Sequence, residues 1–293
     1  MAAILLDGKA VANRVRAQVK RDTQAFVQET GVTPCLAVIL AGEDPASQIY
    51  VKNKKLACEK CGFISKEYLL PETVTQEELE ALVLQLNADP AVHGILVQQP
   101  LPKGIDVSRI NEQIDPDKDV DGFHPVNTGK LMIGTEGLKP CTPAGIVEIL
   151  DAYEIPIEGK ECVVVGRSNL VGKPAAMLML SRNATVTMCH SRTKDLASVT
   201  KRADILIVAI GKAGFISADM VKPGAVVIDV GVNRTEEGVV GDVEFAGASE
   251  VASYITPVPG GVGRMTIAML MKNTLTAAKL QYDKAFGKGE IRV

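Results

Sequence analysis

Three polar residues that could take part in catalysis share one face of a predicted helix. The pattern predicts a helix over residues 45–61, which contains Ser47, Tyr50 and Lys54. Their spacing of i, i+3 and i+7 places the three side chains on one side of the helix. Taken alone, this stripe is typical of a solvated helix face, because other lysines lie close by. Two further segments weigh against that interpretation.

The first of these segments ends a predicted strand over residues 92–98. The strand continues into Gln98-Gln99-Pro100-Leu101-Pro102, which places an amide and a rigid turn at the carboxyl edge of a sheet. Ligands bind at that edge in open α/β sheets. The second segment is the acidic stretch 117–122, which lacks the glycine and the terminal glutamate of a calcium-binding loop. We therefore expect a polar site that holds no metal.

A different set of residues, in the second half of the chain, has features of a nucleotide site. The strand predicted over 161–165 leads into Gly166-Arg167-Ser168, and a helix begins near Gly172. A glycine at the end of a strand allows a tight turn, and the N–H groups of the next helix can hold phosphate. The pattern is not G-x-G-x-x-G, so an ordinary strand–helix turn would also explain it.

The end of the next predicted strand favours NADP over NAD. An NAD-specific domain usually places Asp or Glu about 20 residues after the glycine turn, on the ribose hydroxyl. Here the stretch 187–193 contains Ser191 and Arg192 and no acid. Together with Arg167, these side chains suit a ribose 2′-phosphate. We therefore predict NADP as the cofactor.

Length and composition define the framework that must position these residues. The chain has 293 residues and a formal charge of −3, from 32 Lys+Arg and 35 Asp+Glu, and this length corresponds to about two domains. The balanced charge argues against a nucleic-acid partner. No apolar run reaches the ~18–20 residues of a membrane span, and the N-terminus lacks the features of a signal peptide. We expect a cytoplasmic protein without a membrane partner.

Cysteine usage agrees with a reducing compartment. The six cysteines are scattered along the chain, so we expect no disulfide framework. Cys58 and Cys61 form a C-x-x-C at the end of a predicted helix rather than at its start, where the helix dipole would lower a thiol pKa. Burial as small apolar side chains is the favoured interpretation, and a redox role stays open.

Strands and helices alternate along both halves of the chain, which indicates the α/β class. Strands of continuous apolar residues between helices imply a parallel sheet covered on both faces. The stretch 100–145 is rich in Pro, Gly and Asp and reads mostly as loop, with a domain boundary near 135–150. Further helices are predicted over 9–29, from Thr75 with a capping box, 172–182, 193–202 and 265–284, and further strands over 35–41, 63–70, 184–189, 205–210 and 225–231.

Six motifs occur together in a fixed order. They are S-x-x-Y-x-x-x-K at 47–54, VQQPLP at 97–102, DKDVDG at 117–122, CTP at 141–143, GRSxxVGxP at 166–174 and TPVPGGVG at 256–263. Together they resemble the bifunctional methylenetetrahydrofolate dehydrogenase/methenyltetrahydrofolate cyclohydrolase family, and the match runs from about residue 4 to residue 280. Each motif alone is weak, but six in register are very unlikely to occur by chance.

The resemblance implies an N-terminal α/β domain and a Rossmann-like, doubly wound parallel-sheet domain, with the active site in a cleft between them. We expect the folate domain over residues 1–138, closed by a C-terminal helix over 268–293, and the NADP domain over 139–267. The resemblance also implies a homodimer that acts on tetrahydrofolate derivatives in one-carbon metabolism and purine biosynthesis. Hydride passes from methylenetetrahydrofolate to NADP, and water opens the methenyl intermediate to formyltetrahydrofolate.

The resemblance also assigns roles to residues of the first domain. Lys54 would be the central catalytic group, Tyr50 would stack on the folate, and Gln98 would hold and tune the lysine. Asp121 would bind the amino edge of the pterin. The substrate site would further include Ser47, Val97, Leu101, Pro259, Gly260 and Gly261.

For the cofactor, the resemblance implies the residues Gly166, Arg167, Ser168, Ser191, Arg192 and Val232, the last facing the nicotinamide. Hydride transfer itself needs proximity rather than an acid or a base. Hydrolysis of the methenyl group does need proton transfer, which a partly desolvated lysine can supply near neutral pH.

Alternatives remain at two levels. A monofunctional dehydrogenase of the same fold, linked to NADP or to NAD, is one, although the set Tyr50, Lys54 and Gln98 argues against it. A sensor or scaffold that binds NADP without turnover is the other. In addition, the family usually carries proline where this chain has Arg264. That arginine is either a tolerated change at the rim of a loop or a cation that alters how the folate or the nicotinamide is placed.

Overall fold

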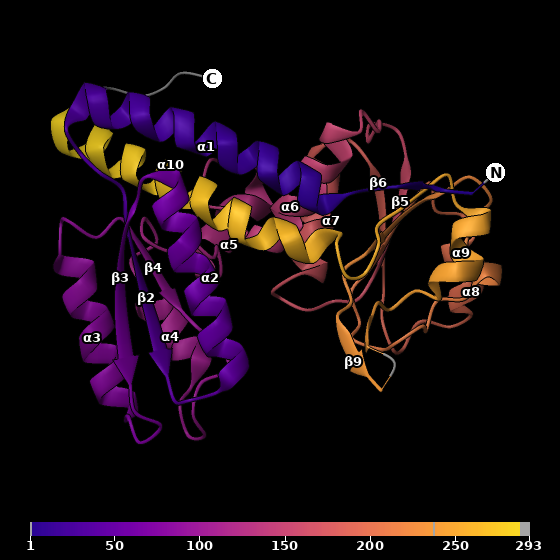
Figure 1. Cartoon of the computed structure of the whole chain (residues 1–293). Helices are drawn as coiled ribbons and strands as arrows, with labels where there is room; N and C mark the ends of the chain where they lie inside the picture. Colours follow the sequence, from indigo (N-terminus) through magenta and orange to yellow (C-terminus); the bar gives the residue numbers. More distant parts are fainter. Residues whose placement is uncertain (1, 237, 288–293) are drawn as a thin grey trace. The chain divides into compact units, whose positions relative to one another are not determined.

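The computed structural model describes residues 2–236 and 238–287 (Figure 1). The chain divides into two compact units. The six-stranded unit contains the residues up to Asn13 and Pro140–Met269, and the three-stranded unit contains Arg14–Lys139 and the chain from Leu270 onward. Of the final helix expected over 268–293, residues 288–293 lie outside the described residues. The first residues of the chain, expected with the folate domain, lie in the six-stranded unit because a short N-terminal strand pairs there.

The three-stranded unit is built on a parallel sheet with strand order β3-β2-β4. Helix α3 packs Leu79, Val83 and Leu86 against the odd-numbered side chains of β2, and α2 lies on the opposite face of the sheet (Figure 1). The strands are β2 (Cys35–Ala41), β3 (Ile64–Leu70) and β4 (Gly94–Val97), and the helices are α2 (Pro45–Cys61), α3 (Gln76–Ala88), α4 (Val107–Gln113) and α5 (Pro125–Ile133). The unit also contains most of α1 (Gly8–Thr30) and of α10 (Met265–Phe286), whose first turns belong to the six-stranded unit.

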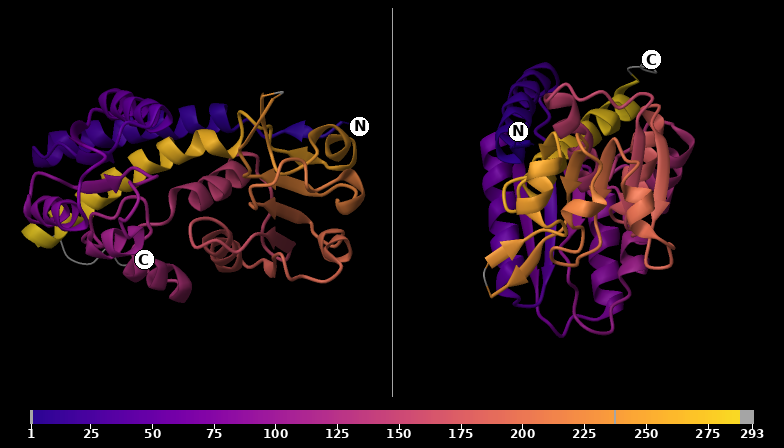
Figure 2. Two further views of the ribbon diagram at one scale, coloured as in Figure 1. Left: turned by 90° about the horizontal axis from the view of Figure 1, so that it is seen from below. Right: turned by 90° about the vertical axis from the view of Figure 1, so that its right-hand side faces the viewer.

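Local sequence signals set the ends of these helices. Thr75 and Glu78 form the predicted capping box at the start of α3, an arrangement that contributes about 1 kcal/mol to helix stability. Gly62 ends α2 in the left-handed conformation at φ 81°, which a glycine adopts without strain. Within this unit α1 and α10 run side by side (Figure 2), and the rings of Phe26 and Tyr282 meet edge to face at 5.9 Å.

The six-stranded unit is a parallel sheet with strand order β1-β11-β8-β7-β5-β6. The chain passes from β5 to β6 on one side and then returns beyond β5 to β7, so the winding direction changes between β5 and β7. This confirms the doubly wound prediction. The strands are β1 (Ile4–Leu5), β5 (Glu161–Val165), β6 (Thr185–Cys189), β7 (Ile205–Val208), β8 (Val226–Asp229) and β11 (Tyr254–Ile255), and the helices are α6 (Cys141–Ala152), α7 (Gly172–Ser181), α8 (Leu196–Thr200) and α9 (Phe245–Val251).

Several short elements were not predicted. The stretch 100–145, read mostly as loop, contains α4, α5 and the start of α6. Side-chain caps explain the first two, since Asp106 accepts from the backbone at the start of α4 and His124 does so at the start of α5. The two-residue strands β1 and β11, α9, and the hairpin of β9 (Asn233–Thr235) and β10 (Gly238–Val240) were also missed. Among the described residues, no helix is long and apolar enough to cross a bilayer.

Candidate active site

The first turn of α2 fixes the helix that carries the polar stripe. Asp44 accepts a hydrogen bond from the backbone N–H of Ser47 at 2.7 Å, and Pro45 occupies the first turn, where its missing N–H costs nothing. Ser47 is 2% exposed and Lys54 is 9% exposed, whereas Tyr50 is half exposed. The stripe is therefore not a solvated face, because two of its three polar members are buried.

Lys54 meets Gln98 at the carboxyl edge of the three-stranded sheet. The Lys54 Nζ donates a hydrogen bond to the Gln98 Oε1 at 2.6 Å. Gln98 directly follows β4, and its backbone N–H donates to the carbonyl of Ile39 in β2 at 2.8 Å. The strand order β3-β2-β4 changes winding direction between β2 and β4, the place where such sheets bind ligands. The Gln98 amide nitrogen also donates to the Gln99 carbonyl at 2.5 Å, which orients Oε1 toward the lysine.

Two other predicted substrate residues on this segment lie in the apolar core. Val97 is 8% exposed and belongs to the cluster that α3 forms with β2, and Leu101 packs against the same cluster. Their side chains therefore support the end of β4 and the turn that follows it. A direct contact with substrate stays a prediction for both residues.

Asp121 follows a segment that runs alongside β4. Asp119 pairs with Ile95 in parallel register, and the chain then turns, because the Gly122 N–H donates to the Asp119 carbonyl at 3.1 Å. Asp121 lies in this turn and is partly exposed. A place for its carboxylate beside Lys54 and Gln98 stays a prediction.

The two cysteines of the C-x-x-C continue the stripe into the protein interior. Both are free and buried, and the Cys58 Sγ lies 3.8 Å from the Met271 Sδ. Burial raises the pKa of Cys58 to about 12 and also raises the pKa of Cys61. Because redox chemistry requires the thiolate, this environment favours the interpretation of the pair as packing residues.

In the six-stranded unit, Gly166 occupies the change of winding direction between β5 and β7. Its φ is 127°, and a Cβ there would lie 2.2 Å from the carbonyl oxygen of Ala209, just after β7. Only glycine fits such a position. The Ser168 Oγ accepts from the backbone N–H groups of Val171 and Gly172 at 3.1 and 3.3 Å, which shapes the start of α7.

The predicted phosphate residues lie on neighbouring strands. The Gly166 N–H donates to the Cys189 carbonyl at 2.9 Å, so the turn after β5 lies beside the turn after β6. Arg167 on the first turn and Ser191 and Arg192 on the second are exposed. Two guanidinium groups and a hydroxyl at adjacent strand ends fit the 2′-phosphate of NADP.

Removal of these side chains should weaken the binding of NADP more than the binding of NAD. We expect Arg167→Ala and Ser191→Ala to raise the Michaelis constant for NADP by about 10- to 100-fold, since each loses a charge-assisted contact of about 1.5–3 kcal/mol. The constant for NAD should change by less than about threefold, because NAD has no 2′-phosphate. Initial rates with each cofactor measure both values. Arg182→Ala, at the other end of α7, is the control, and equal effects on the two cofactors would reject the assignment.

Two buried carboxylates organise the loops after β7 and β8. Asp229 ends β8 and is 4% exposed. It accepts hydrogen bonds from the backbone N–H groups of Gly231, Asp242 and Val243 at 2.9–3.0 Å. Asp242 in turn accepts from the loop 210–212. This arrangement holds the backbone next to Val232, the predicted nicotinamide residue, whose side chain is 59% exposed.

Burial also gives Asp229 a pH signature. Desolvation raises its pKa to about 6, although three backbone N–H groups act to lower it. Because the pKa of this carboxyl is higher in the folded state than in the unfolded state, the free energy of unfolding falls as the pH rises from about 4 to about 6. The fall amounts to roughly 3 kcal/mol.

Denaturant titrations between pH 4 and pH 7 test this expectation. The Asp229→Asn variant should lack the fall in unfolding free energy that wild type shows across this range, whatever its absolute stability. Asp204→Asn is the control: the hydrogen bond from Lys222 lowers the pKa of Asp204, so the contribution of this carboxylate changes below about pH 4 and its removal should leave the slope between pH 4 and pH 7 nearly unchanged. An unchanged slope in Asp229→Asn would contradict the assignment.

The glycine-rich loop 256–264 is shaped by close backbone contacts within the six-stranded unit. Gly260 has a φ of 123°, and its carbonyl accepts from the Lys9 N–H at 3.1 Å. A Cβ on Gly8 would lie 2.1 Å from the Gly261 carbonyl oxygen. The predicted substrate residues Pro259, Gly260 and Gly261 thus belong to the six-stranded unit.

Arg264 ends a short 3₁₀ turn in this loop, Val262–Arg264. Its side chain is exposed, and its backbone N–H donates to the Gly261 carbonyl at 3.1 Å. A proline at this position would remove that donor. The arginine therefore adds a backbone hydrogen bond to the turn as well as a positive charge.

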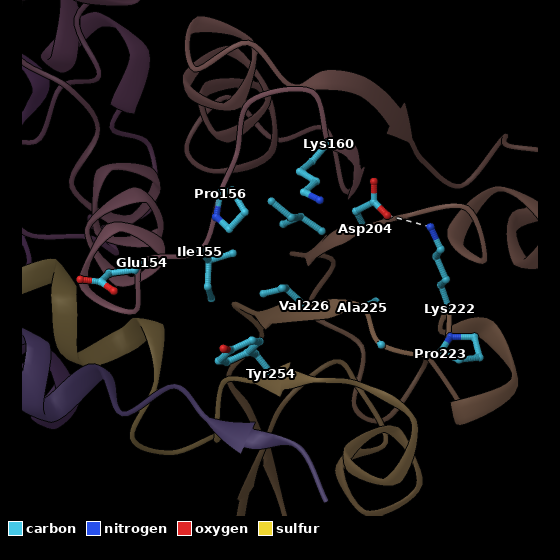
Figure 3. A pocket seen from close by; sticks show the side chains of 12 residues that line it. Glu154, Ile155, Pro156, Lys160, Asp204, Lys222, Pro223, Ala225, Val226 and Tyr254 are labelled. Atoms are coloured by element: carbon cyan, nitrogen blue, oxygen red, sulfur yellow. Dashed lines mark hydrogen bonds and ion pairs between the residues drawn. The ribbon is translucent and has the colours of Figure 1, made fainter. Parts of the chain in front are cut away.

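A separate cavity of about 230 Å³ lies at the opposite edge of the six-stranded sheet (Figure 3). It is lined by the first residues of β7 and β8, by Tyr254, and by the ion pair of Lys222 with Asp204 at 2.7 Å. Because cofactors of doubly wound sheets bind at the carboxyl edge, this cavity is not the cofactor site.

Comparison with known proteins identifies the family. Residues 6–121 match the catalytic domain of tetrahydrofolate dehydrogenase/cyclohydrolase, and residues 140–282 match its NAD(P)-binding domain. The Bifunctional protein FolD of Acetivibrio thermocellus is 58% identical, over 96% of this chain and 99% of the relative.

Solved structures agree. The FolD methylenetetrahydrofolate dehydrogenase/cyclohydrolase of Campylobacter jejuni has a TM-score of 0.93 at 53% identity, over 96% of this chain and all of that one. The Trypanosoma brucei enzyme, complexed with NADP and an inhibitor, has a TM-score of 0.90 at 40% identity, over 96% and 99% of the two chains. This chain therefore belongs to the tetrahydrofolate dehydrogenase/cyclohydrolase family.

Proposed function

We propose that this chain is an oxidoreductase and a hydrolase of one-carbon folate metabolism. It oxidises 5,10-methylenetetrahydrofolate to the 5,10-methenyl form with NADP, and it hydrolyses the methenyl form to 10-formyltetrahydrofolate. The observation that carries this proposal is the buried Lys54 Nζ held 2.6 Å from the Gln98 Oε1 at the carboxyl edge of the three-stranded sheet, in a chain that matches the family over nearly its whole length.

In the oxidation, the residues position the reactants and transfer no proton. Bound NADP would supply the acceptor for the hydride of the methylene carbon. Arg167, Ser191 and Arg192 would hold its 2′-phosphate, and the turn at Gly166 would allow the backbone to approach its pyrophosphate. Tyr50, whose ring is half exposed, stacks on the folate. The rate comes from the proximity and alignment that these contacts impose.

In the hydrolysis, Lys54 moves protons. Water adds to the methenyl carbon, the carbon–N5 bond breaks, and the formyl group stays on N10 as one proton is released. The Lys54 amine transfers protons between the added water and the leaving nitrogen. Gln98 accepts a hydrogen bond from this amine and keeps it directed along the sheet edge. The Asp121 carboxylate binds the donors of the pterin through charge-assisted hydrogen bonds.

We also propose that the chain acts as a homodimer in the cytoplasm, and that its product supplies purine biosynthesis. The family resemblance supports the dimer. The six cysteines are free and buried, as is typical of proteins from a reducing compartment.

A coupled absorbance assay with methylenetetrahydrofolate and NADP tests the two activities. We expect formation of NADPH followed by decay of the methenyl chromophore faster than without enzyme. NADPH formation without accelerated decay would indicate a monofunctional dehydrogenase. Binding of NADP without NADPH formation would indicate a sensor or scaffold.

A further inference from the structure

The segment 117–120, which precedes Asp121, lies along the edge of β4 and is bonded to it. The backbone N–H of Ile95 donates to the Lys118 carbonyl at 2.8 Å. A Cβ on Gly94 would lie 2.6 Å from the Val120 Cγ1, so the glycine allows Val120 to lie this close. The position of the Asp121 backbone is therefore set by the residues immediately before it.

Lys118 ties this segment to the end of α3. Its side chain is 5% exposed, and its Nζ donates to the carbonyls of Leu86, Asn87 and Asp89 at 3.0, 2.7 and 2.8 Å. The last carbonyls of a helix lack partners within the helix, and a cation there is favourable. Lys118 thus caps α3 and anchors the segment at the same time.

Asp119 fixes the backbone just beyond the candidate substrate carboxylate. It is 3% exposed and accepts from the backbone N–H groups of Gly122, Phe123 and His124 at 3.2, 3.1 and 2.8 Å. The Asn127 amide, one turn into α5, donates to the same carboxylate at 2.9 Å. Lys118 and Asp119 therefore hold the chain on both sides of the functional position.

The C-terminal helix α10 holds the remaining side. Asn273 is 7% exposed, and its Nδ2 donates to the carbonyls of Val120 and Lys139, both at 2.8 Å. Val120 directly precedes Asp121, so this hydrogen bond acts on the peptide unit that joins the two residues.

A second contact of the same helix lies about two turns further on. The Gln281 Nε2 donates to the carbonyls of His93 and Asp117 at 2.9 and 3.0 Å, and Lys284 forms an ion pair with Asp117. Residues eight apart differ by about 80° around a helix, so both can face the same neighbouring segment. One face of α10 is thus bonded to both ends of the segment 117–120.

We propose that Asn273 is a positioning residue, which sets the direction of the Asp121 carboxylate through its hydrogen bond to the peptide unit between Val120 and Asp121. The inference rests on the proposed role of Asp121 in binding the pterin. In this way Asn273, a residue of the C-terminal helix, would affect folate affinity and turnover through Asp121 and not by touching substrate.

Asn273→Ala tests the proposal. We expect kcat/KM for methylenetetrahydrofolate to fall about tenfold or more, because small misplacements of a positioning group have large kinetic effects. The dissociation constant of NADP, measured by titration calorimetry, should stay within about twofold of wild type. Asn273→Ser keeps one donor, so its kcat/KM should lie between those of wild type and Asn273→Ala. If Asn273→Ala does not fold, Asn273→Ser takes its place in the test.

Thr274→Ala is the matched control. Thr274 is fully buried beside Asn273, and its hydroxyl donates to the Leu270 carbonyl one turn earlier at 2.8 Å. It should lower thermal stability and leave kcat/KM within about twofold. Equal kinetic losses in Thr274→Ala and Asn273→Ala would overturn the proposal, because they would indicate a general effect on the helix.

A double-mutant cycle separates the inference from the proposed function. In an Asp121→Asn background, Asn273→Ala should lower kcat/KM for methylenetetrahydrofolate by less than about a further twofold, since both substitutions act through the Asp121 carboxylate. If Asn273→Ala lowered kcat/KM in that background by the full factor of about ten, the inference would be overturned. Loss in Asp121→Asn with normal kinetics in Asn273→Ala would overturn only the positioning role. Normal kinetics in Asp121→Asn would overturn the role of Asp121 and the inference with it.

Discussion

Lys54→Met is expected to lose cyclohydrolase activity by a factor of about 10²–10⁴ and to keep dehydrogenase activity within about tenfold of wild type. Methionine keeps most of the length and volume of the side chain but cannot donate or accept a transferred proton. Hydrolysis depends on that proton, whereas hydride transfer depends on proximity. The 9% exposure of Lys54 means that solvent water has little space to replace the amine.

Two separate assays measure this difference. Decay of added methenyltetrahydrofolate reports cyclohydrolase activity, and NADPH formation from methylenetetrahydrofolate reports dehydrogenase activity. Lys52→Met is the control, since Lys52 is an exposed lysine on the same helix, and it should leave both activities within about twofold. Equal loss of both activities in Lys54→Met would mean that Lys54 positions substrate without transferring protons.

Asp121→Asn is expected to reduce folate-dependent kcat/KM by about 100-fold or more, with NADP affinity within about twofold of wild type. Asparagine keeps the shape of the side chain, but it removes the charge and replaces one acceptor by a donor, which opposes the donors of the pterin. Loss of one partner from a charged, desolvated contact costs about 2–5 kcal/mol. Steady-state kinetics with both substrates and NADP titration measure the two effects.

A second aspartate gives the control for this variant. Asp106 accepts from the backbone N–H groups of Ser108 and Arg109 at the start of α4. Asparagine is an equally good N-cap, so Asp106→Asn should have near-wild-type kinetics. Near-wild-type turnover in Asp121→Asn would remove Asp121 from the substrate site.

Much of the fold could be predicted from local sequence signals. The strand 35–41, the helix 45–61 and the strand 161–165 have the predicted bounds, because each combines a clear periodicity with a cap, a glycine or a change of composition at its end. The strands β1 and β11 have two residues each. Such short strands carry no periodicity, and their pairing depends on partners far away in the chain.

In the candidate site too, local motifs could be predicted and the contacts between distant residues could not. The helical stripe with Lys54 and the amide after β4 could be recognised as motifs, but their 2.6 Å contact results from the tertiary packing of α2 on the sheet, where α2 contacts β2 and β3. Within DKDVDG the sequence alone could not distinguish the aspartate directed to a ligand from the residues that hold it. In the structure both Lys118 and Asp119 are buried; Lys118 donates to carbonyls at the end of α3, and Asp119 accepts from the backbone just after it.

Two further residues, Asp229 and Asn273, could not be recognised as important from the sequence. Asp229 is the last residue of the otherwise apolar strand β8, and its carboxylate accepts hydrogen bonds from the backbone at 242–243. Asn273 is a polar residue in the largely apolar helix α10, and its partners lie about 130 to 150 positions earlier in the chain. Such long-range hydrogen bonds cannot be derived from a single sequence, because nothing local specifies them.

We expect this chain to catalyse both reactions and Lys54 to be required for the hydrolysis alone. One time course tests this directly: wild type and Lys54→Met are each mixed with methylenetetrahydrofolate and NADP, and NADPH and the methenyl chromophore are followed together. Wild type should form NADPH with rapid conversion of the methenyl form to 10-formyltetrahydrofolate. In Lys54→Met the methenyl form should accumulate nearly mole for mole with NADPH. Equal methenyl accumulation in the two proteins, or no NADPH from wild type, would contradict the assigned role of Lys54 or the dehydrogenase activity.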